Sequence, residues 1–124
     1  MRYRAVLDAT AIAAYAAGSE HVGEVLGEFA DEKAQFGLPV ACLIEARTAV
    51  TDREVQLLDL LVDLPLAVPL GLEFGPWRQV AAATQLLGGL GRACAALWVA
   101  HGDAGYVLTS EPEAYGEGIE TIPV

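Results

Sequence analysis

The sequence predicts an α/β fold, a three-layer α/β/α sandwich with a mainly parallel central sheet. Short apolar segments alternate with longer segments of helical periodicity, which is typical of strands joined by crossover helices. The 124 residues, 54% of them hydrophobic, favour a single domain that spans residues 1–124 and encloses a well-filled core. The sequence contains no internal repeat and no linker-like stretch that would divide it.

The first segment predicts a buried strand that runs directly into a helix. The apolar run Ala5–Leu7 ends on Asp8, and strong helix formers follow from Ala11 to Ala17. In open α/β sheets, ligands bind at the carboxyl ends of the strands. A buried carboxylate is costly unless it is paired, hydrogen-bonded or bound to a metal. Asp8 is therefore expected either to cap the following helix or to have a functional role.

The middle of the chain predicts helices that alternate with short strands. Ser19 is expected to cap one helix and Asp52 another, because both precede apolar residues at helical spacing. The acidic residues of the first of these helices predict a solvated face, with a partner surface as the alternative. The expected elements are a helix after Ser19, a strand over 37–40, a helix over 41–50 that carries Glu45, a helix after Asp52 with apolar positions between Val55 and Val62, and an edge strand within 64–70, which Pro65 and Pro69 interrupt.

The last third of the chain predicts two helices followed by two strands. If the first of these strands is parallel to the strand that precedes Asp8, then Asp8 and Glu111 lie at the same edge of the sheet. The expected elements are a helix over 73–87, a glycine-rich break at 88–91, a mostly buried helix over 92–101, and strands over 106–109 and 119–124.

Charge and cysteine content narrow the classes of function. Seventeen Asp and Glu residues against seven Lys and Arg residues give a net charge of −10, which disfavours nonspecific nucleic-acid binding by the whole surface. Cys42 and Cys94 stand outside any metal-binding spacing and are expected to be buried, reduced thiols. Because we find no secretory signal and no apolar run long enough to span a membrane, we expect a cytoplasmic protein with no membrane partner.

The acids at the predicted sheet edge are suited to binding a divalent metal ion. Carboxylates without Cys or His ligands favour a hard cation such as Mg²⁺ or Mn²⁺. A metal held there lowers the pKa of a bound water molecule and orients a phosphodiester for attack. The hydroxyl groups of Thr10 and Ser110 lie beside these acids in the sequence and can support the ligands.

Three short motifs, VLDAT at the start, LIEA in the middle and VLTSEP near the end, resemble those of the PIN-domain family. The resemblance is to the small VapC-like members of bacterial toxin–antitoxin systems, and it covers essentially the whole chain. It implies a parallel sheet between helices, Mg²⁺-dependent RNA cleavage, a homodimer and a small DNA-binding antitoxin as partner. Matched by motif, the catalytic and metal-binding residues are Asp8, Glu45 and Glu111, with Thr10 in support.

The chain departs from this family pattern in two places. Glu111 stands where the family usually has an aspartate, which shifts the carboxylate by one methylene group. The family also begins its penultimate helix with an aspartate, but the matching stretch, 89–96, contains no acid. It contains Arg92 instead, which is expected either to neutralise Asp8 or Glu45 in place of a metal, or to lie on the surface and grip phosphate.

Two functions follow from this degenerate acidic site. The first is a Mg²⁺- or Mn²⁺-dependent endoribonuclease, a VapC-like toxin, whose activity is weakened or lost. The alternative is a non-catalytic PIN-like binding module that acts through dimerisation or through an antitoxin-like or regulatory protein partner.

Overall fold

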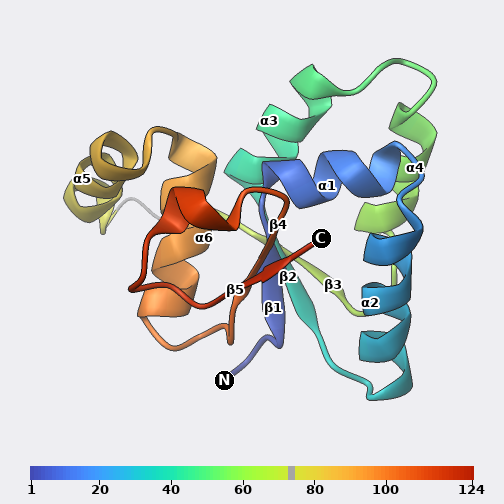
Figure 1. Ribbon diagram of the computed structural model, residues 1–124, viewed down its shortest axis with the longest axis horizontal. Coiled ribbons are helices and arrows are strands. Elements are labelled where there is room, and N and C mark those ends of the chain that lie inside the picture. The colour runs from blue at the N-terminus through green and yellow to red at the C-terminus, as the bar shows by residue number, and fades with distance from the viewer. Residues whose placement is uncertain (73–74) are drawn as a thin grey trace.

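The computed structural model describes residues 1–72 and 75–124 and confirms the predicted three-layer α/β/α sandwich (Figure 1). The central sheet has five strands in the order β3-β2-β1-β4-β5, and every pairing is parallel. The strands are β1 (Ala5–Leu7), β2 (Phe36–Pro39), β3 (Ala67–Leu70), β4 (Val107–Thr109) and β5 (Thr121–Pro123). The helices are α1 (Ala9–Ala16), α2 (Glu20–Asp31), α3 (Val40–Ala49), α4 (Val55–Val62), α5 (Trp77–Leu87), α6 (Leu90–Ala100) and the 3₁₀ helix η1 (Pro112–Tyr115).

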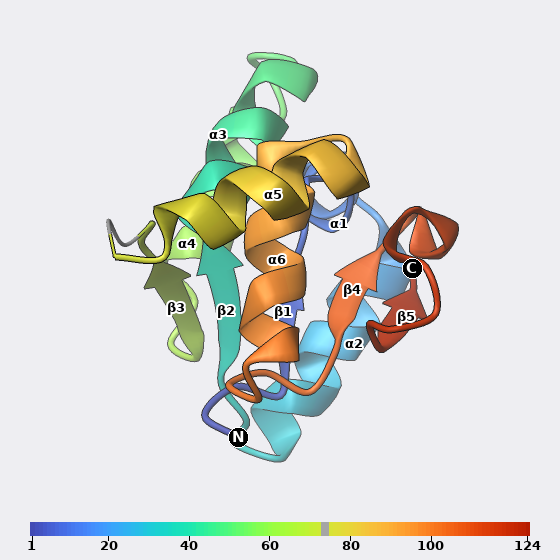
Figure 2. The same cartoon turned by 90° about the vertical axis from the view of Figure 1, so that its left-hand side faces the viewer.

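The helices form the two outer layers. Figure 2 shows α6 lying across β1, β2 and β4, with α5 outside it at the carboxyl ends of the strands. On the other side, α1, α2 and α4 pack together, and α1 contacts β1 and β4 (Figure 1). α3 contacts both α1 and α6, so it closes the sandwich at the carboxyl edge of the sheet.

The middle of the sheet forms the core. All three residues of β1 are fully buried, as expected for a parallel strand with helices on both faces. Small residues cover it, because Ala11 in α1 and Ala93 and Ala95 in α6 are also fully buried. These alanines let both helices approach the sheet closely, which explains the alanine-rich composition of the two segments.

The structure corrects some of the predicted boundaries. β2 begins and ends one residue earlier than expected, and α6 begins at Leu90 rather than Arg92. The helix α6 begins early because Gly88 takes a left-handed conformation and Gly89 is already the N-cap of α6, so the break between α5 and α6 is only two residues long. Arg92 therefore lies in the first turn of α6. Of the helix expected over 73–87, α5 covers 77–87, and residues 73 and 74 lie outside the described residues.

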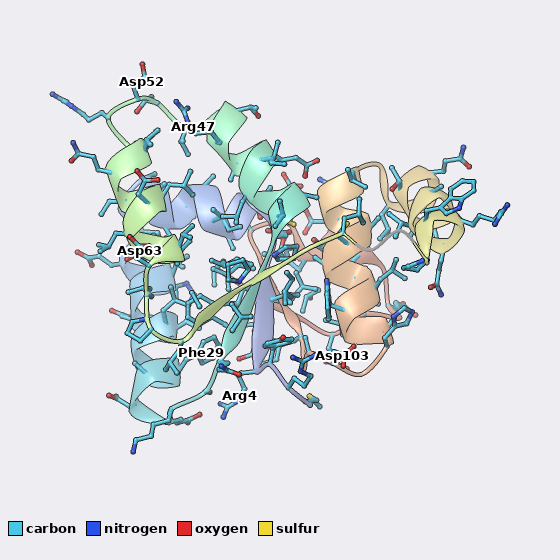
Figure 3. All side chains as sticks on the ribbon, turned by 180° about the vertical axis from the view of Figure 1, so that it is seen from behind. Arg4, Phe29, Arg47, Asp52, Asp63 and Asp103 are labelled. Carbon is cyan, nitrogen blue, oxygen red and sulfur yellow. The ribbon has the colours of Figure 1, made fainter. Side chains whose placement is uncertain are left out.

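Asp52 does not cap α4, contrary to the prediction. The side chain of Glu54 organises the turn instead, because its Oε1 accepts hydrogen bonds from the backbone N–H (2.8 Å) and the hydroxyl (3.0 Å) of Thr51. Asp52 is exposed and pairs with Arg47 at 3.2 Å, across the loop between α3 and α4 (Figure 3). Ser19, by contrast, caps α2 as expected, because its Oγ accepts a hydrogen bond from the backbone N–H of Val22.

The helices are short compared with a lipid bilayer. Across 1–72 and 75–124, no single helix combines the length and the apolar character that a membrane span requires. The pair α5 and α6 meets those criteria only when joined, and the two helices are bent by 115° at their break.

Gly37 provides a test of how tightly the sheet is packed. A Cβ atom on Gly37 would collide with the side chain of Leu70 and lie 3.0 Å from Cγ1 of Val6. We therefore expect Gly37→Ala to lower the free energy of unfolding by about 1–3 kcal/mol, measured by urea denaturation. Gly27→Ala is the matched control: its Cβ meets nothing within 4 Å, so α2 should gain about 0.5–1 kcal/mol. Equal effects of the two substitutions would contradict this account.

Candidate functional site

The three acids predicted from the sequence line one pocket of about 230 Å³ at the carboxyl edge of the sheet. β1 and β4 pair in parallel, with Leu7 beside Leu108, so the residues that follow the two strands meet at this edge as expected. α1, α3 and the start of α6 complete the walls. The lining residues are Asp8, Ala9, Thr10, Glu45, Gly88, Gly89, Arg92 and Glu111.

Asp8 is the most buried of these acids, with 2% of its surface exposed. Its Oδ1 accepts hydrogen bonds from the backbone N–H of Ala11 (3.0 Å) and the hydroxyl of Thr10 (2.6 Å). Its Oδ2 accepts a hydrogen bond from the phenol of Tyr115 at 2.7 Å. Asp8 is thus the N-cap of α1, one of the two roles expected for it, and both of its oxygens are engaged by protein donors.

Tyr115 is a residue of this site that the sequence analysis missed. It ends η1, is 3% exposed, and reaches back across the sheet edge to Asp8. Burial, together with the negative charge of Asp8, raises the pKa of Tyr115, so the phenol stays protonated and donates its hydrogen. No local pattern indicates this role, because Tyr115 lies outside any predicted element and 107 residues from its partner.

Two threonine hydroxyls hold the loop that follows β4. The hydroxyl of Thr10 accepts a hydrogen bond from the backbone N–H of Ser110 at 2.8 Å. The hydroxyl of the buried Thr109 accepts a hydrogen bond from the backbone N–H of Glu111 at 3.0 Å. The two hydroxyls lie 3.3 Å apart. Ser110 thus contacts Thr10 through its backbone, and its side chain does not line the pocket. These bonds fix the position from which Glu111 enters the pocket.

Glu45 reaches from α3 to the start of α6. The N-cap of α6, Gly89, supplies no side-chain hydrogen bond, and the backbone N–H of Gly91 points instead at Oε2 of Glu45, 3.4 Å away. A carboxylate in this position complements the positive end of the helix dipole. Residue 91 must be glycine for this approach, because a Cβ atom there would collide with the Glu45 carboxylate.

The two cysteines, Cys42 on α3 and Cys94 on α6, are free, buried thiols, as predicted. Sγ of Cys42 donates a hydrogen bond to the carbonyl oxygen of Gly91 at 3.2 Å, which strengthens the contact between α3 and α6. Burial raises the pKa of Cys42, and the charge of Asp8 adds to the effect. Burial also raises the pKa of Cys94, so both thiols remain protonated at neutral pH.

Arg92 enters the pocket and forms an ion pair with Glu111. Its Nη1 also donates a hydrogen bond to the carbonyl oxygen of Leu87, at the end of α5, at 3.2 Å. The sequence predicts that Arg92 either neutralises Asp8 or Glu45, or lies on the surface. It lines the same pocket as these two acids, but its ion pair is with Glu111.

The folded residues do not suit a bound Mg²⁺ or Mn²⁺ ion. Asp8 uses about three of its four acceptor positions on protein donors, Glu45 faces a backbone N–H, and Glu111 is paired with a guanidinium group. In the part of the chain that the structure describes, no three His, Cys, Asp or Glu side chains converge closely enough to hold a metal ion. As arranged, the acids hold helix ends and loops in place.

The hydrogen bond between Tyr115 and Asp8 can be tested by removing one hydroxyl group. We expect Tyr115→Phe to lower the free energy of unfolding by about 1.5–3 kcal/mol, because a buried carboxylate loses a donor. Asp8→Ala should cost more, since it also removes the N-cap of α1. Tyr15→Phe is the control, because it removes a phenol hydroxyl outside this network. If Tyr115→Phe and Tyr15→Phe are equally stable in urea, the bond does not stabilise the fold.

No family model matches the chain, and no curated protein matches it. The resemblance to PIN domains therefore depends on the three motifs and on the pocket where they meet.

Proposed function

We propose that this chain is a PIN-like domain that acts by binding, and that metal-dependent RNA cleavage by its acidic pocket is weakened or lost. The order of the motifs VLDAT, LIEA and VLTSEP supports the family, as does the meeting of their acids in one pocket of a parallel α/β sandwich. The single observation that carries the loss of cleavage is the state of Asp8. Both of its carboxylate oxygens accept hydrogen bonds from the protein itself.

A metal-dependent nuclease needs carboxylates with free lone pairs that point at a common position. The pocket instead satisfies each acid from within the chain. Replacing these bonds with bonds to an ion would uncap α1 at Asp8 and free the loop that Arg92 and Glu111 hold. The geometry therefore favours the binding module over the ribonuclease.

The surface of α5 supports a protein partner. Among its residues only Val80 is buried, and the helix packs mainly against α6. Leu86 is 84% exposed and Trp77 is 47% exposed, so apolar side chains face solvent along this helix. Because Trp77 and Leu86 lie on opposite sides of α5, the proposed interaction surface depends on Leu86, since a large apolar side chain this exposed is typical of such a surface.

The distribution of charge favours a second copy of the chain as that partner. The molecule carries a net charge of −10, yet residues 75–102 contain no acid, and Arg78 and Arg92 lie within them. Two copies that meet through α5 place no acid of that helix against the other copy. A homodimer through this face fits both its charge and its apolar character, and a small antitoxin-like protein is the alternative occupant.

If metal-dependent cleavage is lost, Mg²⁺ and Mn²⁺ should not make the wild-type protein cleave RNA. With single-stranded RNA in Mg²⁺ or Mn²⁺, we expect the wild type to cut no faster than Asp8→Asn, with both proteins shown to be folded by circular dichroism. In an active site, this substitution should cost at least roughly 10–100-fold, the loss seen for residues that merely support a ligand. Cleavage by the wild type that Asp8→Asn abolishes would restore the ribonuclease.

The proposed dimer predicts that a charge on α5 separates the copies. We expect Leu86→Glu to raise the dissociation constant of the dimer at least about tenfold, because it buries an unpaired carboxylate, as measured by sedimentation velocity. Leu60→Glu is the matched control: Leu60 is 50% exposed, on α4 in the opposite layer. A wild type that stays monomeric at high concentration would leave the antitoxin-like partner as the occupant of this face.

A further inference from the structure

Arg92 supplies the positive charge inside the acidic pocket. Among the residues that line this pocket, all of them described, three are acids and Arg92 alone is a base. Two contacts hold its guanidinium group: the ion pair with Glu111 and the hydrogen bond to the carbonyl oxygen of Leu87. Two-thirds of the side chain is buried, so its charge lies within the pocket rather than in bulk water.

The position of Arg92 is unfavourable for its own helix. It lies in the first turn of α6, where the exposed backbone N–H groups disfavour a cation and favour an acid. The first turn contains no acid, and Glu45 from α3 supplies the negative charge there instead. A cation in this turn is therefore best explained by the carboxylates around it.

These carboxylates require a counter-ion. Without Arg92, Asp8, Glu45 and Glu111 would face one cavity of about 230 Å³ with no neutralising group from the lining, and like charges at that range raise one another's energy. A divalent cation is the other species that satisfies clustered carboxylates, since its ligands are carboxylate oxygens and water. An arginine and a metal ion are thus two solutions to the same electrostatic problem.

We propose that Arg92 is the built-in counter-ion of this pocket, standing where a divalent cation would otherwise bind, so that its removal converts the pocket into a Mn²⁺ site. Loss of the guanidinium group frees Glu111, whose half-exposed side chain can then turn toward Glu45. Asp8 has about one acceptor position left on Oδ2 for the same ion. This inference rests on the proposed function, because it assumes that the wild-type pocket is closed to metal.

The experiment is a thermal-unfolding titration with Mn²⁺ alone. The wild type is compared with Arg92→Ala, Arg92→Gln and Arg92→Lys, and with Arg78→Ala as the matched control. Arg78 stacks on Trp77 outside the pocket, so Arg78→Ala removes one positive charge and leaves the carboxylates as they are. We expect Mn²⁺ to raise the Tm of Arg92→Ala and Arg92→Gln by several degrees. The wild type, Arg92→Lys and Arg78→Ala should not respond.

A further substitution assigns the ion to this pocket. The double variant Arg92→Ala, Glu111→Gln should lose the response, whereas binding of Mn²⁺ to surface acids would persist in it. Isothermal titration of Arg92→Ala should give one ion per chain. These two results distinguish the pocket from the other carboxylates of a strongly acidic protein.

The remaining outcomes separate the two proposals. If neither the wild type nor Arg92→Ala and Arg92→Gln respond to Mn²⁺, the counter-ion inference is wrong and the binding function stands. If the wild type itself responds and Asp8→Asn does not, the proposed function fails. Unfolding of both Arg92→Ala and Arg92→Gln at room temperature would also overturn the inference, because Arg92 would then be required for folding rather than a replaceable counter-ion.

Discussion

The buried carboxylate of Asp8 is the constraint on which the rest of the structure depends. A charge at the end of a fully buried central strand is tolerated only when donors surround it. Those donors come from two directions: the first turn of α1 and the phenol of Tyr115. The start of α1 and the chain after β4 must therefore arrive at the same point, and Asp8 binds these two segments to the central strand.

The other two acids of the pocket also join separate segments of the chain, through different contacts. Glu45 joins α3 to the start of α6, which otherwise lacks a side-chain cap, and Glu111 joins the loop after β4 to Arg92. A metal ion at such an edge would connect the same segments through coordination bonds. Here hydrogen bonds and one ion pair make those connections, so the fold keeps its acidic edge without needing an ion.

The acidic residues are distributed unevenly along the chain. The acids are spread over most of the chain, whereas α5 and α6 contain none. The outer helix of this segment, α5, exposes Trp77 and Leu86, although α3 and α4 also expose large apolar side chains. The lack of acids in α5 and α6 is therefore the basis of the dimer that we propose through α5.

The sequence by itself determined the alternation of strands and helices, the parallel sheet and the acids at its carboxyl edge, because apolar periodicity and the order of motifs are local properties of the chain. It placed these elements in the right part of the chain, but most of their boundaries differ by one or a few residues, as at the start of α6 at Leu90, and Glu54 takes the role expected of Asp52. Only the tertiary structure decided what the acids contact. The partners Asp8 and Tyr115, Glu45 and Gly91, and Arg92 and Glu111 lie 107, 46 and 19 residues apart, and no local pattern encodes which side chains meet over such distances.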